Sequence, residues 1–289
     1  MRFLIPLALL AVDLLVVQAL ARRSDRRLAV GLIALAGGLG AYALPFLRAA
    51  VPLPRRFPVP LDIGGPLGVF NAAMTSGHVA TALALLAATF AVWVLALRTR
   101  RWRWAVVAGL LSAAHFSFHP FEVPLVSLVV IASTALWALA SGQWVAPLRA
   151  LATWLILASP PVLYQLLAVT QDAVTAQRAA QNVLPGVPWP LTVVSLGVIG
   201  VAGAVGWWRM LRRWPWPDPA AALLVAWVPL QLALLHSPLP FQRRANLGLF
   251  LPLVLLGVGV LASAWRWVVT ALRPRWAGAA PAVAGAVRL

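Results

Sequence analysis

Nine long apolar stretches make up most of this chain, and its ionisable residues lie almost entirely between them. A helix that crosses the hydrocarbon core of a bilayer needs about 20 mainly apolar residues. Stretches of this kind occur at 3–21, 28–47, 78–97, 104–118, 121–141, 147–169, 190–208, 219–236 and 246–265. Because 62% of the residues are apolar and only 10% are charged, a water-soluble fold would lack polar side chains to cover its surface. The sequence therefore predicts an all-α fold, a polytopic transmembrane helical bundle of about nine spans.

The arginines give this bundle a predicted orientation. All 23 basic residues of the 289-residue chain are arginine. If the connection at 22–27 is cytoplasmic, 16 of the 23 arginines fall on that side, as the positive-inside rule favours. We therefore expect the N-terminus outside and the C-terminus in the cytoplasm, in a multi-pass protein of a bacterial cell membrane. Residues 1–270 would form the transmembrane domain, and residues 271–289 a short basic cytoplasmic tail.

The composition also excludes several classes of site and partner. The chain has no cysteine, which excludes disulfides, thiolate metal sites and cysteine nucleophiles. Short arginine clusters between apolar spans are typical of loops that face anionic lipid. The sequence has no aromatic-rich recognition motif, so nucleic acid is not an expected partner.

Two long connections are expected on the outer side, at 48–77 and 170–189. The first is rich in proline and glycine, which favours a turn-rich loop over the outer mouth of the bundle. Asp62 is its only acid and is therefore a candidate catalytic residue by elimination. His78 stands at the outer start of the third span, where it is a candidate substrate-binding residue or simply an interfacial one.

The densest group of ionisable side chains lies between the fourth and fifth spans. It contains His115, His119 and Glu122, and the short fourth span, 104–118, should place this apex below the outer surface. Glu122 can act there as a base, bind a sugar hydroxyl or bind a cation, and His119 can bind a phosphate or a sugar. Pro120 and Glu122 also resemble an N-terminal helix cap, a role that is compatible with these functions. His115 and His119 have the i, i+4 spacing of a metal-binding pair, but a residue that precedes proline tends to leave the helix. We therefore predict no metal site.

A second candidate group comes at the outer start of the last span. Arg243 and Arg244 stand there between Gln242 and Asn246, against the bias that puts arginine inside. Paired guanidinium groups and free helix amides suit a bound phosphate. The alternative is that both arginines extend to the headgroups of surrounding lipid.

Several short motifs resemble, in order, the later helices of bacterial membrane proteins of the GT-C glycosyltransferase superfamily. They are Gly37-Gly38-Leu39-Gly40, Phe70 to His78, His119-Pro120-Phe121-Glu122, Gln181-Asn182-Val183-Leu184-Pro185 and Phe241-Gln242-Arg243-Arg244 with Gly248 and Pro252. The resemblance implies transfer of a sugar from a polyprenyl-phosphate donor at the outer face, by an inverting displacement that an acid assists.

On this resemblance Arg243 and Arg244 hold the lipid-linked phosphate, and His78, His119 and Gln242 help to bind the substrate. The superfamily carries its catalytic acid in an N-terminal outer loop that this sequence does not show before Arg22, so Asp62 or Glu122 would have to serve. Alternatively, a separate chain supplies that region, or the protein is an inactive remnant. The sequence does not identify a cofactor, and a divalent cation is one option.

Two other functions are compatible with the sequence. A transporter or lipid flippase requires polar residues through the middle of the membrane. Apart from Asp13 and His115, the predicted spans contain almost no such residues. A non-catalytic membrane scaffold would leave the outer polar groups as caps and lipid anchors.

Overall fold

The computed structural model describes residues 4–35, 77–181, 189–238, 242 and 246–276. Within these ranges every regular element is a helix, which confirms the predicted all-α fold. The elements are α1 (Leu4–Ala19), α2 (Arg23–Leu35), α6 (Gly77–Thr99), α7 (Trp102–Phe118), the short 3-10 helix η1 (Pro120–Glu122), α8 (Val123–Ser141), α9 (Val145–Gln171), α10 (Ala173–Gln181), α11 (Trp189–Leu211), α12 (Pro219–Leu235) and α13 (Phe250–Trp276).

Five of these helices are long and apolar enough to cross a membrane. They cover His78–Thr99, Pro120–Ser141, Val145–Gln171, Thr192–Leu211 and Phe250–Ala271. Shorter apolar helices occur at Ala8–Ala19 and Pro219–Leu235. Inside a bilayer a backbone has no water to bond, so an apolar segment of this length satisfies its amides and carbonyls by forming a helix. The chain is thus a helical membrane protein.

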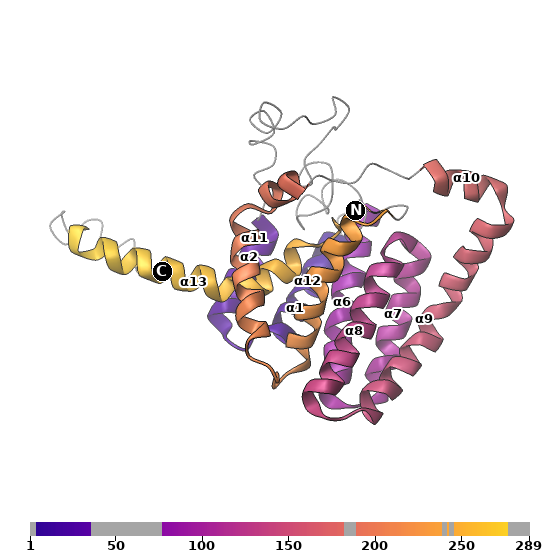
Figure 1. The fold of residues 1–289 in the computed structure, drawn as a ribbon, viewed down its shortest axis with the longest axis horizontal. Helices are drawn as coiled ribbons and strands as arrows, with labels where there is room; N and C mark the ends of the chain where they lie inside the picture. Colours follow the sequence, from indigo (N-terminus) through magenta and orange to yellow (C-terminus); the bar gives the residue numbers. More distant parts are fainter. Residues whose placement is uncertain (1–3, 36–76, 182–188, 239–241, 243–245, 277–289) are drawn as a thin grey trace.

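Helices α6 to α9 run antiparallel to one another along the chain (Figure 1). Helix α7 packs against both α6 and α9, whereas α8 packs mainly against α12. Helix α6 is central, because 72% of its apolar window is buried, against 11% for the outlying α9. The connections at the lower end of this group in Figure 1 are short. Arg100 and Gly142, with φ angles of 56° and 66°, adopt the left-handed conformation that such turns require.

The bundle has two chemically different ends. Residues 22–27, 98–103, 143–149 and 209–213 lie at one of them, which we call the arginine-rich end. The other end carries His78 at the start of α6 and the turn between α7 and α8. We call it the histidine end.

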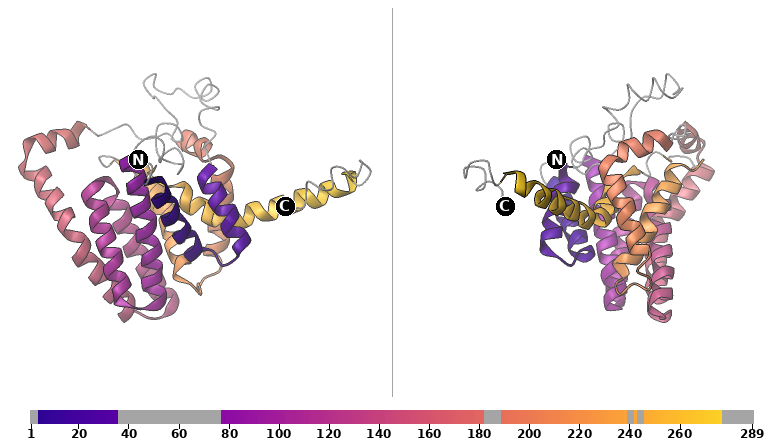
Figure 2. Two further views of the ribbon diagram at one scale, coloured as in Figure 1. Left: turned by 180° about the vertical axis from the view of Figure 1, so that it is seen from behind. Right: turned by 60° about the vertical axis from the view of Figure 1, so that its left-hand side comes forward.

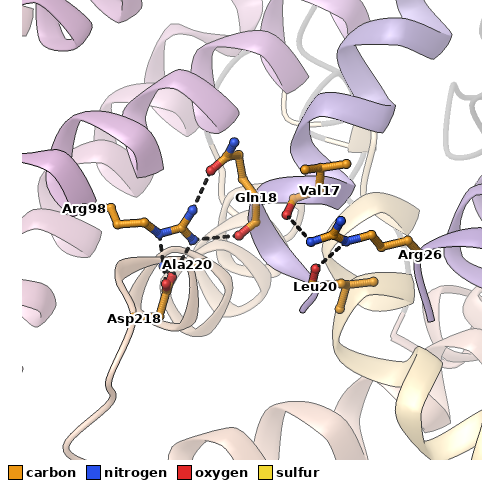
Figure 3. Close-up of polar contacts among 7 residues, drawn as sticks. All are labelled: Val17, Gln18, Leu20, Arg26, Arg98, Asp218 and Ala220. Carbon is orange, nitrogen blue, oxygen red and sulfur yellow. Dashed lines mark hydrogen bonds and ion pairs between the residues drawn. The ribbon is translucent and has the colours of Figure 1, made fainter. Parts of the chain in front are cut away.

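A guanidinium group joins three helices at the arginine-rich end (Figure 3). Arg98, in the last turn of α6, donates to both carboxylate oxygens of Asp218 at 2.9 Å, and to the side chain and backbone oxygens of Gln18 at 2.5 and 2.8 Å. Asp218 in turn caps α12 by accepting from Ala220 N. The ends of α1, α6 and α12 are therefore held in one register.

Helix α13 departs from the direction of the other long helices. It runs across the bundle and away from it in the views of Figures 1 and 2. Gly248, with a φ of 67°, turns the chain just before this helix begins. The span predicted at 246–265 is thus helical from Phe250. The helix continues to Trp276, past the domain limit predicted at residue 270.

Close backbone approach holds α13 against α11. A Cβ atom added to Gly206 of α11 would stand 2.0 Å from the backbone oxygen of Leu256, and one added to Gly257 of α13 would stand 2.9 Å from the backbone of Ala202. Small residues allow helices to approach in this way, and the packing contacts they permit stabilise membrane bundles.

Candidate functional site

The turn between α7 and α8 builds the polar cluster at the histidine end. Helix α7 ends at Phe118, and His119 leaves the helical region with φ −143° and ψ 74°, as expected for a residue that precedes proline. Its backbone amide still donates to His115 O at 2.7 Å. Residues Pro120–Glu122 then form η1, which turns the Glu122 side chain back towards the end of α7.

His119 and Glu122 form a buried pair. The Nδ1 atom of His119 is hydrogen-bonded to Oε2 of Glu122. The Nε2 atom of His115 lies 3.8 Å from the same oxygen. His115 and Glu122 are fully buried, and His119 is 4% exposed. The apex between the fourth and fifth predicted spans therefore lies inside the bundle.

His78 connects the buried pair to the surface of the bundle. Its ring stacks on that of His119, with centroids 5.7 Å apart and planes inclined by 29°. His78 is exposed at the start of α6, whereas His119 is buried. The helices α6 and α7 and the turn η1 thus bring three of the predicted site residues, His78, His119 and Glu122, into one group.

The geometry separates the roles of the two paired residues. A carboxylate that accepts from Nδ1–H holds an imidazole in the tautomer whose Nε2 carries a lone pair. Nε2 of His119 is buried and has no hydrogen-bond partner in the described ranges. In that tautomer Nε2 of His119 can accept a proton while the Glu122 carboxylate orients the ring.

The capping interpretation of Glu122 is wrong. Glu122 does stand at the N-cap of α8, but its side chain makes no cap hydrogen bond there. The carboxylate is hydrogen-bonded to the His119 ring instead.

The sequence placed His115 one turn below the candidate site but not within it. The structure brings His115 within 3.8 Å of Glu122 because the chain reverses at Pro120. Among the described residues, no group of three or more His, Asp or Glu side chains is arranged to hold a metal ion.

The second predicted group is described only in part. Asp62, Arg243 and Arg244 lie outside the described residues, while Gln242 and Asn246 on either side of the arginines are both buried. Oδ1 of Asn246 has no hydrogen-bond partner in the part of the chain that the structure covers.

The chain that follows the arginine pair packs near the histidine cluster. Gln231 of α12 donates to the Leu247 backbone oxygen at 2.8 Å, and Gly248 packs against Leu83 of α6. Leu83 stands five residues from His78 on the same helix, which is roughly 8 Å along its axis. Leu247 and Gly248, which follow the second group in the chain, thus lie towards the same end of α6 as His78.

His236 belongs to a different set of contacts. Its ring stacks on Trp189 of α11, with centroids 3.6 Å apart, and its Nε2 lies 3.3 Å from Thr192 Oγ1. These contacts join the end of α12 to the start of α11. His236 is therefore a packing residue outside the cluster.

Replacing Glu122 by alanine is expected to lower the free energy of unfolding by about 2 kcal/mol, because Nδ1 of His119 would lose its acceptor inside the protein. Unfolding followed by tryptophan fluorescence in detergent measures the change. In a double variant with His119→Ala the two losses should be less than additive. Asp13→Ala is the control, since Asp13 is exposed on α1 and an acid within an apolar span costs free energy, so its loss should not lower the free energy of unfolding. Strictly additive losses would show that the pair does not interact.

No family model, curated protein or solved structure matched this chain in the comparisons.

Proposed function

We propose that this chain is a GT-C-like membrane glycosyltransferase, which moves a sugar from a polyprenyl-phosphate donor at the extracytoplasmic face. The observation that carries the proposal is the buried His119–Glu122 pair at the histidine end. Attack by a hydroxyl on a sugar carbon needs a positioned proton acceptor, and an imidazole oriented by Glu122 can serve as one. The resemblance of the surrounding motifs to the superfamily supports the same reaction.

The proposal includes nine spans in a bacterial cell membrane, with the N-terminus outside and the C-terminus in the cytoplasm. Each of the nine predicted segments overlaps a helix in the described ranges. Five of the helices in those ranges are long and apolar enough to cross a membrane. The connections that carry most arginines lie at one end of the bundle, which supports placing that end in the cytoplasm. The histidine end then faces outwards.

In this reaction a hydroxyl oxygen of the acceptor attacks the anomeric carbon of the sugar. His119 Nε2 takes the hydroxyl proton, the new carbon–oxygen bond forms, and the bond from that carbon to the phosphate oxygen breaks. The electron pair leaves with the polyprenyl phosphate, whose charge Arg243 and Arg244 stabilise. His78 and Gln242 would contact the sugar, and Asp62 is the alternative proton acceptor.

The structure offers the transporter and scaffold functions no specific support. Several buried polar side chains that lie along the spans bond locally. Thr134 and Ser133 donate to Val130 O in their own helix, and Ser112 accepts from Trp154 Nε1. Among the described residues these groups do not form the continuous polar path that a transporter or a flippase needs.

The arginine pair provides the direct test. A double Arg243→Ala, Arg244→Ala variant is expected to bind polyprenyl phosphate about 100-fold more weakly than the wild type, because each guanidinium contributes charge-assisted hydrogen bonds to the phosphate. Binding of a fluorescent polyprenyl phosphate to the purified chain in detergent measures this.

The matched control is the double Arg212→Ala, Arg213→Ala variant, which removes the same charge from exposed positions at the arginine-rich end. It should bind like the wild type. Unchanged affinity in the Arg243, Arg244 variant, or an equal loss in both double variants, would contradict the proposal.

A further inference from the structure

A cavity of about 570 Å³ lies at the arginine-rich end, far from the histidine cluster. It is formed where the turn between α6 and α7 meets the turn between α8 and α9. Its lining includes three arginines, Arg100, Arg101 and Arg149, together with Trp102 and Trp144. Its size is within the range of small-molecule sites in proteins.

The three guanidinium groups at this cavity are not neutralised by the described part of the protein. None of them makes an ion pair or a side-chain hydrogen bond within those ranges, and no acidic side chain lines the cavity. Arg98 differs, since Asp218 and Gln18 satisfy it. Three unpaired cations around one cavity repel one another, and a bound anion relieves that repulsion.

Two helices also begin at this cavity. Arg101 is the N-cap of α7 and Trp144 the N-cap of α9, and neither helix has a side-chain cap. The first two backbone amides of each helix therefore have no side-chain cap as acceptor, and both helix dipoles have their positive ends here. Amides and guanidinium groups together form the usual donor set for a phosphate.

We propose that this cavity binds a phosphate-bearing anion, with Arg100, Arg101 and Arg149 as its ligands. The surroundings favour the headgroup of an anionic lipid as the source of that phosphate. Trp102 and Trp144 are 66% and 45% exposed, as is usual for tryptophan at a membrane interface.

Exposed apolar side chains occur farther along the same two helices. Leu110 of α7 and Leu148 and Ile156 of α9 are all largely exposed. A lipid whose headgroup occupies the cavity can lay its acyl chains against these residues. This inference does not depend on the proposed sugar transfer, which concerns the opposite end of the bundle.

The test uses the purified full-length chain in a non-ionic detergent, with short-chain phosphatidylglycerol as the probe. Bound lipid is counted by native mass spectrometry, and affinity is measured from tryptophan fluorescence. Arg149→Gln and Arg101→Gln are each expected to weaken binding about tenfold, because each removes charge-assisted hydrogen bonds. Arg149→Lys, which keeps the charge but loses the planar fork, should fall between them and the wild type.

The control is Arg212→Gln, since Arg212 is exposed at the same end but lies over the Trp208 ring, 4.5 Å from its centroid. It should bind phosphatidylglycerol like the wild type. Phosphatidylcholine, which has no net charge, tests whether binding requires an anionic lipid. Inorganic phosphate, added as a competitor, tests whether the site takes a free anion instead of a lipid headgroup. Specific binding of phosphatidylglycerol alone identifies a headgroup site, and competition by inorganic phosphate identifies a free-phosphate site. Equal losses in all arginine variants, or no binding of either probe, would overturn the proposal.

Discussion

His119→Ala is expected to reduce the turnover of sugar transfer by about 100- to 10,000-fold, the usual contribution of a positioned proton acceptor. The Michaelis constant for the lipid-linked donor should change little, because the phosphate contacts proposed for Arg243 and Arg244 remain. Glu122→Gln should also lower turnover, by at least about tenfold, since it removes the carboxylate that orients the imidazole. Transfer of a labelled sugar from polyprenyl phosphate to acceptor in proteoliposomes measures both variants.

The control for this prediction is His236→Ala. His236 is a histidine at the same end of the bundle, but it contacts Trp189 and Thr192 rather than the cluster. Its replacement should leave turnover within a factor of about three, as expected for a residue remote from the reaction. Full activity in His119→Ala would show that another residue accepts the proton, and Asp62 is the next candidate. Transfer that is absent from the wild type would refute the enzyme proposal itself.

Gly206→Ala should reduce stability more than any other single change considered, with a loss of about 3 kcal/mol or failure to fold. The added methyl group would stand 2.0 Å from the Leu256 backbone oxygen, so α11 and α13 would have to separate. The neighbour is backbone, which cannot yield by changing rotamer as a side chain can. Resistance to unfolding by heat in detergent, followed by tryptophan fluorescence, measures the loss.

Gly259→Ala is the matched control on the other member of this helix pair. Gly259 lies in α13, and a Cβ added there would meet nothing within 4 Å. This variant should be neutral or gain about 0.5 to 1 kcal/mol, because alanine favours a helix over glycine. Equal effects of the two changes would show that α11 and α13 do not approach as closely as the structure has them.

Much of the histidine cluster follows from local sequence rules. His119 precedes proline and leaves the helix as predicted, and the short connection to Glu122 places the two side chains three residues apart at a buried apex. What could not be predicted is the partner of the Glu122 carboxylate. A cap on α8 and a bond to His119 satisfy the same local pattern, and the packing of the turn decided between them.

The contribution of α6 to the site could not be read from the sequence. His78 begins α6 and His119 follows α7, so two helices separate them in the chain. Neither motif predicts that their rings stack. The arginine cavity is similar, because Arg100 and Arg101 lie in the turn between α6 and α7 whereas Arg149 lies in α9, and only the packing of the helices brings them to one cavity.

The amino-acid sequence is sufficient to establish that this protein is helical and belongs in a membrane. Long apolar segments must satisfy their own backbone hydrogen bonds in lipid, and this requirement acts within each segment, so the predicted segments and the helices overlap. Which segments lie together is visible only in the folded chain. The packing of α13 on α11 and the contact of His78 with His119 depend on the shapes of side chains that are far apart in the chain. The apolar pattern of one helix does not specify which other helix packs against it.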